Sequence, residues 1–143
     1  MNHPLTLGDS VLDEDHLRLE DLVLQLRDAP LDEVSRRLEA VREHASRHFA
    51  LEDIEIRAMA DGNAKYHLDE HAAVLNSLDE VMVVLTQVDV AAEKKALLIN
   101  RLATELHVWL PGHVHEMDAG VASHRSKQRF GGAPVKIARR PGT

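Results

Sequence analysis

The chain contains no cysteine and no long hydrophobic run. Without thiolates it cannot form disulfides, zinc–thiolate sites or cysteine-ligated iron–sulfur clusters, so any bound metal must take nitrogen and oxygen ligands. No apolar segment approaches the roughly 18 residues of a membrane-spanning helix. We therefore expect no association with a membrane.

The start of the chain also lacks the features of a secretory signal. Its first ten residues, MNHPLTLGDS, contain neither a basic region nor an apolar one. We therefore expect a cytoplasmic protein. The length of 143 residues, with 44% hydrophobic and 29% charged residues, fits one domain with a substantial core.

Charge is unevenly distributed along the chain. The net charge is −7, but all 24 acidic residues precede position 119 and six of the 17 basic residues follow position 118. The body is thus strongly acidic, which argues against nucleic-acid binding because that requires a concentrated positive face. We expect residues 1–128 to form the folded domain and residues 129–143 to form a mobile basic tail.

Apolar residues repeat at alternating intervals of three and four, which predicts four amphipathic helices. The first should span residues 11–27 and end before Pro30, and the second should start near residue 31 and end at a C-cap formed by Gly62 and Asn63. The third should span residues 64–87, and Asp89 should cap a fourth that starts near residue 90. Short links between helices predict an all-α fold, an antiparallel up-and-down four-helix bundle with a basic C-terminal extension.

Five of the ten histidines, together with two carboxylates, recur at helical spacing. Members of a pair are four or five residues apart, about one helical turn, so both side chains can point the same way. Most also continue the apolar stripe of their helix, as His16 does between Leu12 and Leu19. The full set is His16, His48, Glu52, His67, His71, His113 and Asp118, with Asp118 beside its stripe.

One such pair alone would be weak evidence in a chain with ten histidines. The alternative to a metal site is a set of core histidines that bond other polar groups. However, each buried imidazole or carboxylate costs several kcal/mol unless it is paired or bound to a metal, and a domain is stable by only about 5–15 kcal/mol. We therefore interpret the set as a site for two metal ions inside the bundle.

The donor types limit which metal could bind. Nitrogen and oxygen donors fit iron, with manganese, cobalt or zinc as substitutes. Seven donors are too few for two octahedral ions unless both carboxylates bridge and a small oxygen species completes the core. Ferritin-like bundles use Glu-x-x-His motifs, and none of the ten histidines has a glutamate three residues before it, so that class is disfavoured.

Four segments resemble the hemerythrin family of non-haem di-iron proteins. They are LDEDHLRL around His16, HFALED from His48, HLDEH from His67 to His71, and WLPGHVHEMD up to Asp118. The separation of nineteen residues between His48 and His67 is also similar to the family's. Together the segments span most of residues 12–118.

This resemblance implies a specific assignment of roles. His67, His71 and His113 would hold one iron, His16 and His48 the other, and Glu52 and Asp118 would bridge the two in an oxo- or hydroxo-bridged centre. The implied function is reversible binding of dioxygen for carriage, storage or sensing. An apolar pocket would protect the bound gas, and the matching residues are Leu19, Phe49, Trp109, Leu110 and Val114.

Two features depart from the family pattern. Glu20 stands where an apolar residue is common in the family. It either reaches solvent, where it can pair with a neighbouring arginine, or lies near the open iron as a proton relay or a labile extra ligand. A relay at this position would make the protein a di-iron peroxidase or oxidase. Pro111 and Gly112 should disrupt the fourth helix just before His113.

The remaining polar candidates have weaker claims. We expect His44 and His107 at the boundary of the core, each bonded to water or an acid. Asp13 is a candidate partner for a ligand. The others are expected at the surface or the termini: His3, His115 and His124.

Overall fold

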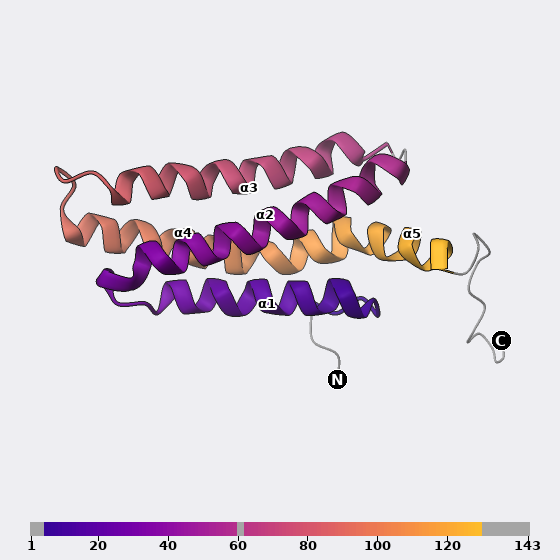
Figure 1. Ribbon diagram of the computed structural model, residues 1–143, viewed down its shortest axis with the longest axis horizontal. Helices are drawn as coiled ribbons and strands as arrows, with labels where there is room; N and C mark the ends of the chain where they lie inside the picture. The colour runs from indigo at the N-terminus through magenta and orange to yellow at the C-terminus, as the bar shows by residue number, and fades with distance from the viewer. Residues whose placement is uncertain (1–4, 60–61, 130–143) are drawn as a thin grey trace.

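The computed structural model describes residues 5–59 and 62–129 (Figure 1). Within these ranges the chain forms helices and no strand. The four long helices are α1 (Ser10–Arg27), α2 (Val34–Met59), α3 (Ala64–Leu85) and α4 (Ala92–His113). Three shorter elements complete the order: the 3-10 turn η1 (Leu31–Glu33), the π-helical segment η2 (Val114–Asp118) and α5 (Ala119–Arg129).

The four long helices pack side by side along their lengths (Figure 1). Short links join them, so consecutive helices run antiparallel, and both α2 and α4 contact α1 and α3. The predicted all-α four-helix bundle is therefore confirmed. Beyond η2, α5 extends the bundle at one end and packs against α2.

Asp9 fixes the start of α1. Its Oδ1 accepts hydrogen bonds from the backbone N–H groups of Val11 (3.1 Å) and Leu12 (3.2 Å), which satisfies donors that a helix start leaves open. Its Oδ2 accepts a hydrogen bond from Arg125 Nε at 2.8 Å. Asp9 therefore ties α5 to the start of α1.

Two predicted helix caps are wrong. Gly62 does not adopt the positive φ of a helix C-cap, and Asn63 instead precedes α3 as its N-cap residue. Asp89 does not cap α4: it lies in a turn, and the helix starts at Ala92, after Ala91. Asp89 therefore belongs to the turn that follows α3 and not to the start of α4.

The core consists of two apolar clusters of unequal size. The larger includes Leu19, Phe49 and Leu110, and the smaller is formed by Leu12, Ile56 and Val121 near the α5 end. On α1, on α2 and on the segment from α4 through η2 to α5, the candidate metal residues lie between residues of the larger cluster and residues of the smaller cluster. The site is therefore enclosed by hydrophobic packing on both sides.

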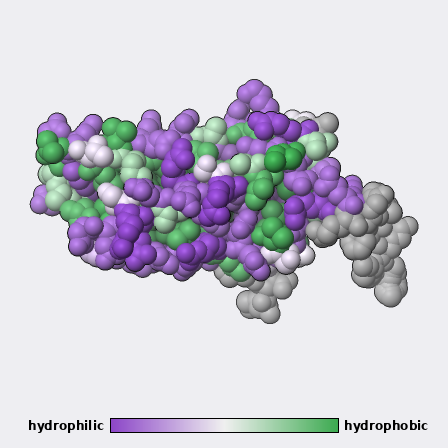
Figure 2. Space-filling model, viewed as in Figure 1, coloured by the Kyte–Doolittle hydropathy of each residue, from purple (hydrophilic) through white to green (hydrophobic). Residues whose placement is uncertain are grey.

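The face of the molecule drawn in Figure 2 has mixed polarity, with hydrophobic residues scattered among hydrophilic ones. Among the helices that the structure describes, none has the length and apolar character needed to span a membrane. The predicted basic tail, residues 129–143, lies outside the described residues except for the backbone of Arg129, which ends α5.

Candidate metal centre

The seven candidate residues meet in the middle of the bundle, and each is at most 5% exposed to solvent. Their ligand atoms form two overlapping groups in which all atoms lie within 4.8 Å of one another. The first group contains three histidines and the second contains two, and both groups share Glu52 and Asp118. The groups are Glu52, His67, His71, His113 and Asp118, and His16, His48, Glu52 and Asp118.

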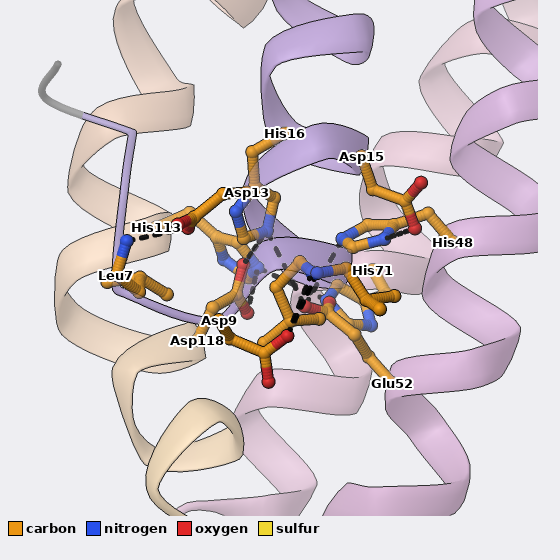
Figure 3. Close-up of polar contacts among 12 residues, drawn as sticks. Leu7, Asp9, Asp13, Asp15, His16, His48, Glu52, His71, His113 and Asp118 are labelled. Carbon is orange, nitrogen blue, oxygen red and sulfur yellow. Dashed lines mark hydrogen bonds and ion pairs between the residues drawn. The ribbon is translucent and has the colours of Figure 1, made fainter. Parts of the chain in front are cut away.

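Each shared carboxylate divides its two oxygens between the groups (Figure 3). Asp118 Oδ1 lies 2.8 Å from His67 Nε2 and 3.2 Å from His113 Nε2, whereas Oδ2 lies 3.0 Å from His16 Nε2. A carboxylate with its oxygens directed in this way is arranged to bridge two cations.

Glu52 is arranged in the same manner. Its Oε1 lies 3.3 Å from His71 Nε2 in the three-histidine group. Its Oε2 lies 3.2 Å from His48 Nε2 and 3.6 Å from His16 Nε2 in the other group. The two carboxylates therefore mark the boundary between a five-residue and a four-residue set of donors.

The π-helical segment η2 brings Asp118 into this arrangement. A π turn closes its hydrogen bond over five residues instead of four, and such turns are frequent at functional sites. His113 and Asp118, five apart, consequently project to the same side. In a regular α-helix, Asp118 would be rotated away from the stripe that carries His113.

The predicted helix disruption just before His113 is wrong. α4 continues through Pro111 as far as His113, and the irregular segment follows it. Proline removes only its own donor, and the carbonyls of Leu110 and Pro111 still accept from the Val114 N–H. The local change in helix type therefore lies between the two candidate ligands.

Opposite charges within the site shift several pKa values. Burial alone would lower the pKa of His16, but the carboxylates of Asp118 and Glu52 outweigh it and raise this pKa to about 9. Burial would raise the pKa of Glu52 and of Asp118, yet the surrounding histidines hold both below their usual range. The metal-free centre is thus a cluster of opposite charges in a low-dielectric interior.

This cluster predicts how the stability of the metal-free protein depends on pH. A folded-state pKa raised from 6.5 to about 9 stabilises the fold fully below pH 6.5, and that stabilisation is lost as the pH rises through 9. We expect the free energy of unfolding to fall by about 3 kcal/mol at most between pH 6 and pH 10. Urea unfolding of the metal-free chain tests this, with His16→Leu as the comparison. A wild-type profile as flat as that of the variant would contradict the prediction.

The buried polar atoms also indicate that the residues suit a cation. Both ring nitrogens of His16, Nε2 of His48 and both oxygens of Glu52 are buried and make no well-directed hydrogen bond within the described structure, although some of them lie as close as 3.0–3.2 Å to an oppositely charged group. Unsatisfied buried polar groups are costly. Because these atoms converge and consist of imidazole nitrogens and carboxylate oxygens, a divalent or trivalent metal ion would satisfy them.

Three further carboxylates support the candidate ligands from outside. The Nδ1–H groups of His48, His71 and His113 can donate to Asp15 (3.0 Å), Asp53 (2.8 Å) and Glu70 (2.7 Å), respectively. Such bonds fix the tautomer that leaves Nε2 free to bind a metal.

These supporting carboxylates were not predicted from the sequence. Asp13 was the predicted partner of a ligand, but it accepts hydrogen bonds from the backbone N–H groups of Leu7 (2.6 Å) and Gly8 (3.1 Å). A signal was nevertheless present, since every supporting carboxylate is adjacent in sequence to a candidate ligand and supports a histidine on the next long helix. The adjacent pairs are Asp15–His16, Glu52–Asp53 and Glu70–His71.

Of the five residues expected to line an apolar pocket, three line a cavity beside the site and two do not. Leu19, Trp109 and Leu110 line an apolar cavity of about 10 Å³, a volume at the lower limit for one water molecule. Phe49 instead stacks on His71, with ring centroids 3.9 Å apart, and Val114 is fully buried in η2. Trp109 also stacks on His113 at 4.3 Å.

The other candidate polar residues lie outside both donor groups. Glu20 Oε2 lies 3.4 Å from His107 Nε2, so a histidine on α4 is among its partners. His44 Nε2 donates to the backbone oxygen of Asp15 at 2.9 Å. His107 is therefore half-buried with an acidic partner, as predicted, whereas His44 is buried and bonds a backbone carbonyl in place of the predicted water or acid.

The expected surface histidines differ in environment. His115 is exposed, as predicted, whereas His124 is half-buried and lies 3.5 Å from Glu55. The prediction for His124 is therefore wrong, because α5 docks against α2. His3 lies outside the described residues.

Comparison with protein families gives a match over most of the chain. The model of the hemerythrin HHE cation-binding domain matches residues 7–123, which include all seven candidate ligands. Comparison with curated proteins and with solved structures gives no significant match. Because the matched region covers most of the chain and coincides with the bundle, the chain belongs to the hemerythrin HHE cation-binding domain family.

Proposed function

We propose that the chain holds two iron ions and binds dioxygen reversibly, in carriage, storage or sensing. His67, His71 and His113 hold one ion, and His16 and His48 hold the other. Glu52 and Asp118 bridge the pair, together with an oxo or hydroxo group. The observation that carries this proposal is the division of each shared carboxylate's oxygens between the two groups.

The unequal donor sets explain where an external ligand would bind. Five protein residues converge on one group and four on the other. Iron with nitrogen and oxygen donors commonly takes six ligands, so the two-histidine group leaves more positions for small molecules. A pair of iron ions held by these residues would supply the electrons that dioxygen accepts on binding and returns on release.

The protein's own contribution is to orient the donors and to exclude water. The outer carboxylates hold the imidazoles of His48, His71 and His113 with Nε2 inward. The aliphatic side chains near Leu19 and Leu110 limit the number of proton donors beside the centre. Reversible binding requires this restriction, because additional protons would favour cleavage of the O–O bond.

Cycles of oxygenation test the proposed function. The reduced chain is loaded with two Fe(II) per molecule, exposed to oxygen, and degassed repeatedly while its visible spectrum is recorded. We expect a charge-transfer band that appears with oxygen and disappears on degassing. Irreversible conversion to the oxidised form within the first cycle would contradict reversible binding and favour the peroxidase or oxidase alternative.

That alternative assigned a proton relay to Glu20, whose described ion pair is with His107 and which belongs to neither donor group. We therefore predict that Glu20→Leu changes the autoxidation rate of the oxygenated protein by less than about twofold at any pH. A positioned proton donor contributes roughly 10²–10⁴-fold, and its removal would also erase a titration from the rate profile. Stopped-flow measurement across pH, with Glu39→Leu as the surface control, separates the two cases. An autoxidation rate that is tenfold slower in Glu20→Leu, but not in Glu39→Leu, would support a relay role for Glu20.

A further inference from the structure

A second cavity approaches the candidate metal centre from the surface between α1, α2 and α5. Its volume is about 130 Å³, compared with about 10 Å³ for the apolar cavity near Trp109. His48 and Glu52 form part of its lining, and both belong to the two-histidine group. The larger cavity therefore reaches the side of the centre that has fewer protein donors.

The mouth of this cavity is unusually apolar for a protein surface. Val11 on α1 and Leu51 and Ile54 on α2 line it and are 49%, 60% and 65% exposed, respectively. Deeper in the cavity, Leu12 and Val121 add buried aliphatic surface. Exposed apolar side chains that gather around a concave site favour a ligand with an apolar body.

The polar groups in the lining favour a neutral hydrogen-bond donor. The carboxylates of Asp15 and Glu55 both line the cavity and can accept hydrogen bonds. Arg125 also lines it, but its guanidinium already contacts Asp9 at 2.8 Å and Glu55 at 3.8 Å. Among the side chains of the lining, the carboxylates of Asp15, Glu52 and Glu55 outnumber the guanidinium of Arg125, so the protein's own groups disfavour an anionic ligand.

Size limits the ligand further. Binding sites for drug-sized molecules usually measure about 300–1,000 Å³, so a cavity of about 130 Å³ can hold only a compact molecule such as one substituted ring. Water alone is poorly suited to this space, because five of the ten residues that line it are aliphatic and the surface they expose to the cavity is mainly apolar.

We propose that this α1–α2–α5 cavity is a binding site for a small neutral molecule with an apolar body and a hydroxyl group, of the phenol or short-chain alcohol class. The hydroxyl donates its one hydrogen bond to a carboxylate of the lining, that of Asp15 or that of Glu55, and the apolar body lies among Leu12, Leu51 and Val121. The site places such a molecule beside His48 and Glu52, outside the apolar pocket near Trp109. Because binding needs only the cavity, it can fail or succeed independently of reversible oxygen binding.

Fluorine NMR titration of 4-fluorophenol against the full chain tests this site. The chain is loaded with zinc so that the sample is diamagnetic. We expect saturable binding to one site at millimolar concentration, several-fold weaker binding of fluorobenzene, and at least tenfold weaker binding of 4-fluorobenzoate. No saturation, equal binding of fluorobenzene, or binding of the benzoate as tight as that of the phenol would overturn the proposal.

Variants at the mouth locate the site. Val11→Trp and Leu51→Trp add bulk from opposite walls at exposed positions, so the fold should tolerate them, and each should weaken 4-fluorophenol binding at least tenfold. Val83→Trp is the matched control, because Val83 is 57% exposed on α3 and is not part of the cavity lining. Binding that survives both mouth substitutions, or that is lost equally in Val83→Trp, would overturn the assignment. Unchanged iron content in all three variants would show that the proposed metal centre is intact.

Discussion

We predict that Glu52→Ala abolishes binding of both proposed metal ions, and not only of one. Each oxygen of this carboxylate faces a different group of histidines, at 3.3 Å from His71 Nε2 and 3.2 Å from His48 Nε2. Its loss therefore takes one donor from each group and leaves the positive charge of two ions with a single shared carboxylate. We expect less than half an ion per chain after anaerobic loading and desalting, compared with two in the wild type.

Two further variants show whether the loss of metal is specific to the bridging carboxylate. Asp53→Ala removes only the support of His71, at 2.8 Å from its Nδ1, and the loss of such a partner typically weakens metal binding 10–100-fold. Glu43→Ala, an exposed carboxylate on the same helix, should leave the metal content unchanged. Circular dichroism verifies the fold of each variant. One full ion retained by Glu52→Ala would contradict its bridging role.

Removal of the metal will lower the thermal stability of the bundle strongly. Seven buried polar residues surround the centre, and ligands that bind only the folded state stabilise it by about 4 kcal/mol at a thousandfold excess over the dissociation constant. For a chain of this size that corresponds to a melting temperature roughly 10 °C higher. Calorimetry of the loaded and the chelator-treated protein measures the difference. Equal melting temperatures would mean that metal binding is not coupled to the fold.

The fold was predictable from the sequence because its determinants are local. The alternation of apolar residues by three and four fixed which face of each helix is buried, and Pro30 marked the first break between helices. The caps at Asp89 and at Gly62 with Asn63 were predicted wrongly. Several residues near each helix end can serve as caps, and the choice depends on how the connecting turn packs.

The convergence of the seven candidate residues was also predictable, since they follow the apolar stripes. Their finer geometry was not. The π-helical segment between His113 and Asp118 is a costly local conformation that tertiary contacts must stabilise, and no residue type encodes it. Asp15, Asp53 and Glu70 were missed because they flank the stripes and retain solvent exposure, so in sequence they resemble ordinary surface charges.

Mössbauer spectroscopy of the chain loaded with isotopically enriched iron and exposed to oxygen tests the central claim, a pair of iron ions in unequal surroundings, most directly. Three histidines face one position and two face the other, while Glu52 and Asp118 are common to both. We predict two iron signals of equal area, because the ions differ in protein donors and only one binds oxygen. A single signal, or a total area that corresponds to one iron per chain, would contradict the account.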